Sequence, residues 1–147
     1  MSEDFFKGID AQLNKQKAAK TASEVASDKN REFAKALIPQ LAAIADGYAD
    51  QCKERGIDAS VKTHEFSISV TLRYKGGVER SLVGSPQYDR DYRFSFEEFF
   101  PDNNGKRYKT APMQWYDESN WSNDTFEAKV KKLITDHIFY ADRFGGI

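Results

Sequence analysis

The chain has 147 residues with 22 basic and 23 acidic side chains, which gives a formal net charge of −1. This length suits one domain, and the hydrophobic share of 39% supports a real core rather than disorder. The near-neutral charge disfavours a general binder of nucleic-acid phosphates, so we expect no such partner. The single cysteine excludes an internal disulfide framework, and no stretch has the roughly 18 apolar residues of a membrane span, so we expect a cytoplasmic protein.

The start of the chain looks separable from the rest. Phe5, Phe6, Ile9 and Leu13 recur at near-helical spacing, and few apolar side chains follow them from Asn14 to Ser27. We therefore divide the chain into an N-terminal arm or short amphipathic helix over residues 1–23 and a single domain over 24–147. The arm is either a mobile or loosely docked extension or a partner-binding helix anchored by Phe5 and Phe6.

The next segment predicts a long helix. Ser27 or Asp28 suits its N-terminal cap, and Gly56 suits the left-handed residue that ends it. Pro39 lies inside the pattern and predicts a kink, because proline removes a backbone donor and clashes with the preceding turn. The apolar stripe that defines the helix comprises Phe33, Leu37, Leu41, Ile44, Tyr48 and Cys52.

After this helix, the spacing at which apolar residues recur changes from about 3.6 residues to 2 residues. Residues 62–74 alternate apolar and polar, which predicts one strand of an antiparallel sheet with one dry face. Residues 75–77 form the turn into a second strand. A three-residue loop with a glycine bulge places Val78 and Leu82 on the dry face, whereas a two-residue loop places polar residues there, so the pattern favours the longer loop.

Two more strands and a helix complete the predicted fold. The third strand includes the run RDYRFSFEEF, residues 90–99, and the fourth covers 107–116, with Pro112 marking an edge or a bulge. A capping sequence near Asp124 begins the last helix. The predicted class is α+β: a long N-terminal helix kinked near Pro39, a four-stranded antiparallel meander and a C-terminal helix, with the helices on one face of the sheet.

The aromatic run of the third strand has two interpretations. Tyr92, Phe94 and Phe96 share a face with a basic residue, as in strands that stack RNA bases. The run lacks the small residues of such motifs and is crowded by carboxylates. A sheet covered on one face must also bury its apolar side, so we interpret these rings as core.

Two groups of side chains are candidates for binding. Arg80 and Arg90, with Tyr88, suit a pocket for an anionic group at one end of the sheet, or else pair with nearby carboxylates. Trp115, Tyr116 and Trp121 are dense for a strand end and a loop. Residues of these types are enriched at binding surfaces, although they also suit the edge of a core.

Catalytic and metal motifs are absent from the sequence. The two histidines, His64 and His137, follow no metal-ligand spacing, so we expect no metal and no cofactor. A Cys52–His64 pair is the barest form of a nucleophilic dyad, but Cys52 lies on an apolar stripe, where a free thiol is usually a small buried hydrophobe.

We therefore expect a non-catalytic protein that acts by binding another protein, as an adaptor, an inhibitor or a toxin-neutralising partner. The alternative is a module that binds a small ligand or nucleic acid through the Arg/Tyr cluster, and a minimal enzyme is the third hypothesis. The sequence leaves open whether the chain is a monomer or a homodimer.

Overall fold

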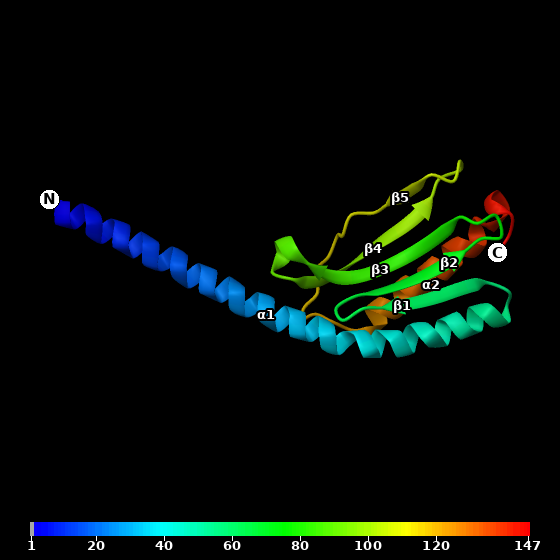
Figure 1. Cartoon of the computed structure of the whole chain (residues 1–147), viewed down its shortest axis with the longest axis horizontal. Helices are drawn as coiled ribbons and strands as arrows, with labels where there is room; N and C mark the ends of the chain where they lie inside the picture. Colours follow the sequence, from blue (N-terminus) through cyan, green and yellow to red (C-terminus); the bar gives the residue numbers. More distant parts are fainter. Residues whose placement is uncertain (1) are drawn as a thin grey trace.

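The computed structural model describes residues 2–147 and confirms the α+β class (Figure 1). Met1, the first residue of the expected arm, lies outside the described residues. The long helix α1 (Ser2–Glu54) precedes an antiparallel sheet of five strands, and the helix α2 (Asn123–Phe139) follows the sheet. The strands are β1 (Asp58–Thr63), β2 (Ile68–Arg73), β3 (Glu79–Gln87), β4 (Arg93–Pro101) and β5 (Arg107–Lys109), in that spatial order. Two short 3₁₀ helices are η1 (Tyr88–Arg90) and η2 (Ala141–Phe144).

Helix α1 is longer than the sequence predicted, with 53 residues and no break. Its second half packs on the sheet, whereas its first half extends away from the domain (Figure 1). Pro39 lies inside the helix without interrupting it. Figure 1 shows the helix changing direction in its cyan part, around residue 40, so the expected kink is a bend of a continuous helix.

The end of α1 matches the predicted cap. Gly56 has a φ of +79°, and the Ile57 amide donates to the Cys52 carbonyl at 2.9 Å. Ile57 is buried beside Cys52, which is the hydrophobic contact expected just beyond a left-handed cap. The polypeptide therefore reverses at Gly56 and enters the sheet directly.

The four-strand prediction was wrong, because the segment expected to form one strand over 62–74 contributes to two. β1 ends at Thr63, and a tight turn closed by the His64 amide on the Ser67 carbonyl, at 2.8 Å, leads into β2. This turn contains neither glycine nor proline to mark it, and only Lys62 and Thr63 of β1 lie inside the segment 62–74. Because Thr63 pairs with Ile68, the face toward the core changes from odd-numbered residues in β1 to even-numbered residues in β2, which one continuous alternation does not predict.

The hairpin between β2 and β3 confirms the predicted loop length. The Tyr74 amide donates to the Val78 carbonyl at 2.8 Å, which leaves residues 75–77 as the loop. Leu82 pairs with Val70, and Arg80 pairs with Leu72. Leu82 and Arg80 therefore share the face that the helices cover, where both are buried.

The third and fourth predicted strands are shorter than expected. β4 begins only at Arg93, because Asp91 and Tyr92 have φ values of +51° and +59° and break the extended backbone. Of the strand expected over 107–116, three residues form β5 and Tyr116 makes an isolated bridge with Phe94. β5 is the edge strand, as Pro112 had suggested for this segment.

One core joins both helices to the same face of the sheet. Phe94 and Phe96 lie in it, with exposed fractions of 0% and 7%, so the aromatic run is scaffold at these two positions. Gly84, opposite Phe96, leaves room for both rings, since a Cβ there would lie 2.7 Å from Phe94. The core side chains of the two helices include Leu37, Leu41, Ala45, Phe126, Val130 and Leu133.

Candidate functional site

The first part of α1 projects from the domain. Every residue from Ser2 to Val25 is exposed, apart from Ile9, which is half-buried. The first hydrogen bond from this helix to another element is donated by the Ser23 hydroxyl to the Asp91 carboxylate, at 2.6 Å. About 21 residues therefore extend beyond the domain, which at about 1.5 Å per residue is roughly 30 Å of helix. The segment expected as an arm is thus continuous with α1 (Figure 1).

The tip of this projection is apolar. Phe5 and Phe6 are 65% and 58% exposed, with ring centroids 5.2 Å apart, and Leu13 is exposed on the following turns. Residues 2–13 contain three carboxylates, those of Glu3, Asp4 and Asp10, and one lysine, Lys7. The tip therefore carries a net negative charge. Residues 14–22 contain three lysines and no carboxylate.

A small set of polar contacts fixes the direction in which α1 leaves the domain. The Asn30 side-chain amide donates to the Asp91 carbonyl at 2.9 Å, and Asn30 is buried. The Arg31 guanidinium lies 4.4 Å from the centroid of the Tyr92 ring. The two residues with left-handed backbone, Asp91 and Tyr92, are thus those that hold the helix.

Trp121 and Tyr116 belong to the edge of the core. Tyr116 is 7% exposed, and burial raises the pKa of its hydroxyl. The Trp121 ring packs 6.0 Å from Phe96 and 5.5 Å from Tyr116, and its indole donates to Asn123 at the start of α2. The structure therefore joins two of the three residues of this group to the core.

The third aromatic residue, Trp115, lies with a different partner. Arg90 stacks over it with the guanidinium carbon 4.3 Å from the ring centroid. Tyr88, which is 82% exposed, packs edge-on against Tyr92. Arg90, Tyr88 and Trp115 thus lie beyond the end of β3, near the contact that holds α1.

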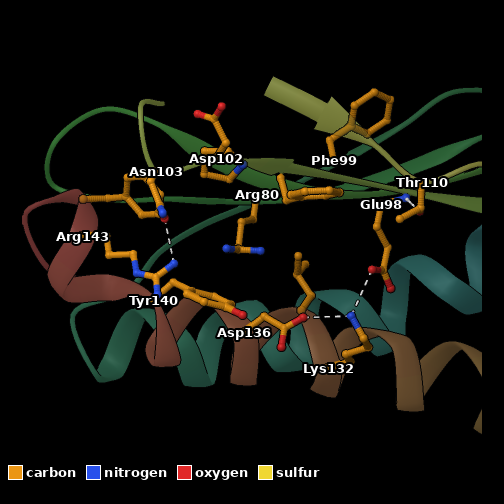
Figure 2. Close-up of a pocket in the computed structure, with 14 residues that line it drawn as sticks. Arg80, Glu98, Phe99, Asp102, Asn103, Thr110, Lys132, Asp136, Tyr140 and Arg143 are labelled. Carbon is orange, nitrogen blue, oxygen red and sulfur yellow. Dashed lines mark hydrogen bonds and ion pairs between the residues drawn. The ribbon is translucent and has the colours of Figure 1, made fainter. Parts of the chain in front are cut away.

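Arg80 lies at the opposite end of β3 from Tyr88. A strand of nine residues spans about 30 Å, so the structure does not assemble Arg80, Tyr88 and Arg90 into one cluster. Arg80 instead lines a cavity of about 510 Å³ between the sheet and the end of α2 (Figure 2). Its Nε donates to the Tyr74 hydroxyl at 2.8 Å, and its guanidinium lies 4.7 Å from the centroid of the Tyr140 ring.

The cavity contains further charged residues that the sequence did not indicate. Lys132 donates to Asp136 at 2.8 Å and to Glu98 at 3.1 Å, and the hydrogen bond to Asp136 is the main reason why its pKa is raised. Arg143 donates to the Asn103 side chain at 2.7 Å and lies 4.8 Å from the centroid of the Tyr140 ring. No local pattern links β3 to η2, so this group could not be found from sequence spacing.

A buried histidine lies behind Arg80. The His137 ring is 0% exposed and stacks on Tyr74 with centroids 3.9 Å apart. Burial, and secondarily the charge of Arg80, lowers the pKa of His137 to about 4. Burial also raises the pKa of Tyr74. Both rings are therefore neutral near pH 7.

The Cys52–His64 pair is not assembled. Cys52 is buried at the end of α1 beside the start of β1, whereas His64 follows the far end of β1 and is exposed. Burial raises the pKa of the Cys52 thiol, which disfavours the reactive thiolate. Among residues 2–147, no three His, Cys, Asp or Glu side chains are placed to hold a metal ion, and no helix is long and apolar enough to cross a bilayer.

Comparison with known proteins gave no relative: no family model matches the chain, no curated protein matches it in sequence, and no solved structure matches it. Function is therefore argued from the geometry alone.

Proposed function

We propose that this chain is a non-catalytic, cytoplasmic protein that binds another protein through the tip of α1. The observation that carries the proposal is the projecting helix itself, which ends in Phe5 and Phe6. Two exposed phenylalanines on adjacent positions, with Leu13 about two turns on, bury little within the chain and contribute most when a partner covers them. An adaptor, an inhibitor or a toxin-neutralising protein all work in this way.

The chemistry of the tip specifies the partner surface. A helix that presents one apolar stripe fits a hydrophobic groove, with the aromatic side chains as anchors. The negative balance of residues 2–13 suits a groove with basic side chains at its rim, because complementary charge speeds encounter and fixes register. The three lysines of residues 14–22 make the part of α1 between the tip and the domain polar.

The domain supplies a rigid base for this helix. Asn30, Arg31 and Ser23 hold α1 against Asp91 and Tyr92, so the tip is displayed at a fixed angle. Pre-organisation of this kind lowers the entropy that a flexible arm would lose on binding. The alternative function, binding of a ligand or nucleic acid by Arg80, Tyr88 and Arg90 acting together, has less support because the three do not meet.

The test uses the full chain as bait in the native cytosol, followed by reconstitution with the purified captured protein. We expect one stoichiometric partner, whose affinity falls by at least about a hundredfold in a Phe5→Ala/Phe6→Ala variant. Phe139→Ala is the matched control, because Phe139 is 75% exposed but lies on α2. Retained binding by the double variant contradicts the proposal. If light scattering shows self-association that is lost in the Phe5→Ala/Phe6→Ala variant, the partner is a second copy of this chain and not another protein.

A further inference from the structure

We propose that the cavity between the sheet and the end of α2 binds a small organic carboxylate, held by Arg80 with help from Arg143. This site is independent of the projecting helix. The starting observation is that Arg80 is 8% exposed and makes one side-chain hydrogen bond, to the Tyr74 hydroxyl. A guanidinium has five N–H donors, so most of those on Arg80 have no protein acceptor among residues 2–147.

Arg80 also lacks a counter-charge. None of the ion pairs within residues 2–147 includes it. The buried side-chain atoms that lack a hydrogen-bond partner in this part of the chain do not include the terminal nitrogens of Arg80, so these nitrogens are reached from the cavity. The terminal nitrogens of Arg80 point into the cavity (Figure 2). A ligand carboxylate in the cavity can therefore reach the free donors of Arg80.

The other charged side chains of the cavity leave Arg80 and Arg143 as the groups that can bind an anion. Lys132 forms ion pairs with two carboxylates, those of Glu98 and Asp136, which neutralise its charge. Asp102 accepts the backbone amides of its own turn, at 2.9 and 2.8 Å. Arg143 is the second cavity guanidinium that makes no ion pair with a carboxylate of the described residues 2–147, and it packs on the same tyrosine ring as Arg80.

The charge balance favours a monoanion. Three basic side chains and three acidic ones line the cavity, so a ligand with one negative charge fits it better than a dianion. The planar fork of arginine matches the two oxygens of a carboxylate. Beside the guanidinium groups, Tyr140, Phe144, Leu133 and Pro101 provide apolar walls, and the volume lies in the range of small-molecule pockets. The ligand class is therefore a carboxylate with a small apolar or aromatic body.

The test follows the ¹⁵N-labelled full chain by NMR during titration with benzoate, the neutral isostere benzamide, and phenyl phosphate. We expect benzoate to give saturable shifts at the Arg80 Nε–H and at the amides of Tyr140 and Phe144. Benzamide should bind at least about tenfold more weakly, because it cannot pair with the guanidinium charge. Absence of saturable benzoate shifts, or equal affinity for benzamide, overturns the proposal. Tighter binding of phenyl phosphate overturns the carboxylate assignment.

Two variants and one control locate the site. Arg80→Met keeps an unbranched apolar stem but removes the guanidinium, and it should abolish the benzoate shifts. Arg143→Gln changes a side chain at the cavity mouth and should weaken benzoate by about threefold or more, which decides the matter if Arg80→Met does not fold. Arg107→Gln is the control, since Arg107 also stacks on an aromatic ring, at 4.3 Å from Phe99, but does not line the cavity. Unchanged affinity in Arg143→Gln and in a folded Arg80→Met refutes the site.

Discussion

The imidazole of His137 stacks on the phenol ring of Tyr74, with the ring planes 9° from parallel. Neither imidazole nitrogen has a hydrogen-bond partner within residues 2–147, although the ring is fully buried. Tyr74, the residue after β2, stacks on it, and the positive charge of Arg80 on β3 opposes its protonation. This stack therefore requires a neutral histidine and ties the stability of the cavity wall to pH.

The first prediction follows from the sign of that pKa shift. The unfolded chain binds a proton at His137 near pH 6.5, whereas the folded chain does so only near pH 4. Above pH 6.5 the imidazole is neutral in both states, and stability does not depend on it. Between pH 6.5 and pH 4 the unfolded state binds more protons, so the free energy of unfolding falls as the pH falls, by at most about 3 kcal/mol.

Denaturant unfolding at several pH values measures this loss. His137→Phe retains an aromatic ring against Tyr74 and should flatten the dependence between pH 6.5 and pH 4. His64→Gln, at an exposed position, should leave it unchanged. A His137→Phe protein with the same acid dependence as the parent would show that other groups cause it.

The second prediction concerns the glycine that accommodates the aromatic core. In Gly84→Ala the new methyl group would lie 2.7 Å from the Phe94 ring and 2.8 Å from the Phe96 ring. Because these rings are packed on all sides, we expect a loss of about 1–3 kcal/mol in the free energy of unfolding. Gly47→Ala, inside α1 with no atom near the new methyl group, should instead stabilise by up to about 1 kcal/mol. Equal effects of the two substitutions would refute the explanation.

A third prediction separates the contacts that hold α1 at Asp91. The Asn30 amide is buried, so Asn30→Ala leaves the Asp91 carbonyl without a donor and should cost about 1–2 kcal/mol. Ser23 makes its bond in an exposed position, and Ser23→Ala should cost less than about 0.5 kcal/mol. Thermal unfolding of both variants gives the comparison, and the reverse order would show that the outer contact holds the helix.

The fourth prediction tests whether Cys52 has any chemical role. Its side chain is buried, and burial raises the pKa of the thiol, so a disulfide reagent at pH 8 should label it only when the end of α1 opens. The labelling rate should rise at least about a hundredfold in denaturant. Rapid labelling of the native chain would reopen the thiol as a nucleophile.

Much of the fold followed from local pattern. The loop of the β2–β3 hairpin and the Gly56 cap were predicted because each depends on a few neighbouring residues. β1 was missed because its turn, from His64 to Ser67, has no glycine or proline to mark it. The start of the third strand was predicted several residues too early, because no sequence signal marks the left-handed backbone at Asp91 and Tyr92.

The two candidate sites also differ in whether local sequence could indicate them. The exposed tip with Phe5 and Phe6 was visible in the sequence, because an apolar group followed by a polar shaft is a local feature. The cavity was not, because Arg80, Tyr140 and Arg143 meet only when the end of α2 packs against the start of β3.

The sequence by itself determined the class of fold, the core-facing positions of β2 and β3 and the C-terminal end of α1, since periodicity and turn chemistry act over a few residues. The start of α1 was not among these, because the helix begins at Ser2 and not at the caps expected at Ser27 or Asp28. Only the tertiary structure decided that α1 runs on beyond the domain as one helix, and that Arg80 is separated from Arg90 and lies without a carboxylate beside a neutral His137. Those outcomes depend on which distant side chains share a buried volume, and burial is what sets the cost of an unpaired charge and the pKa of a histidine.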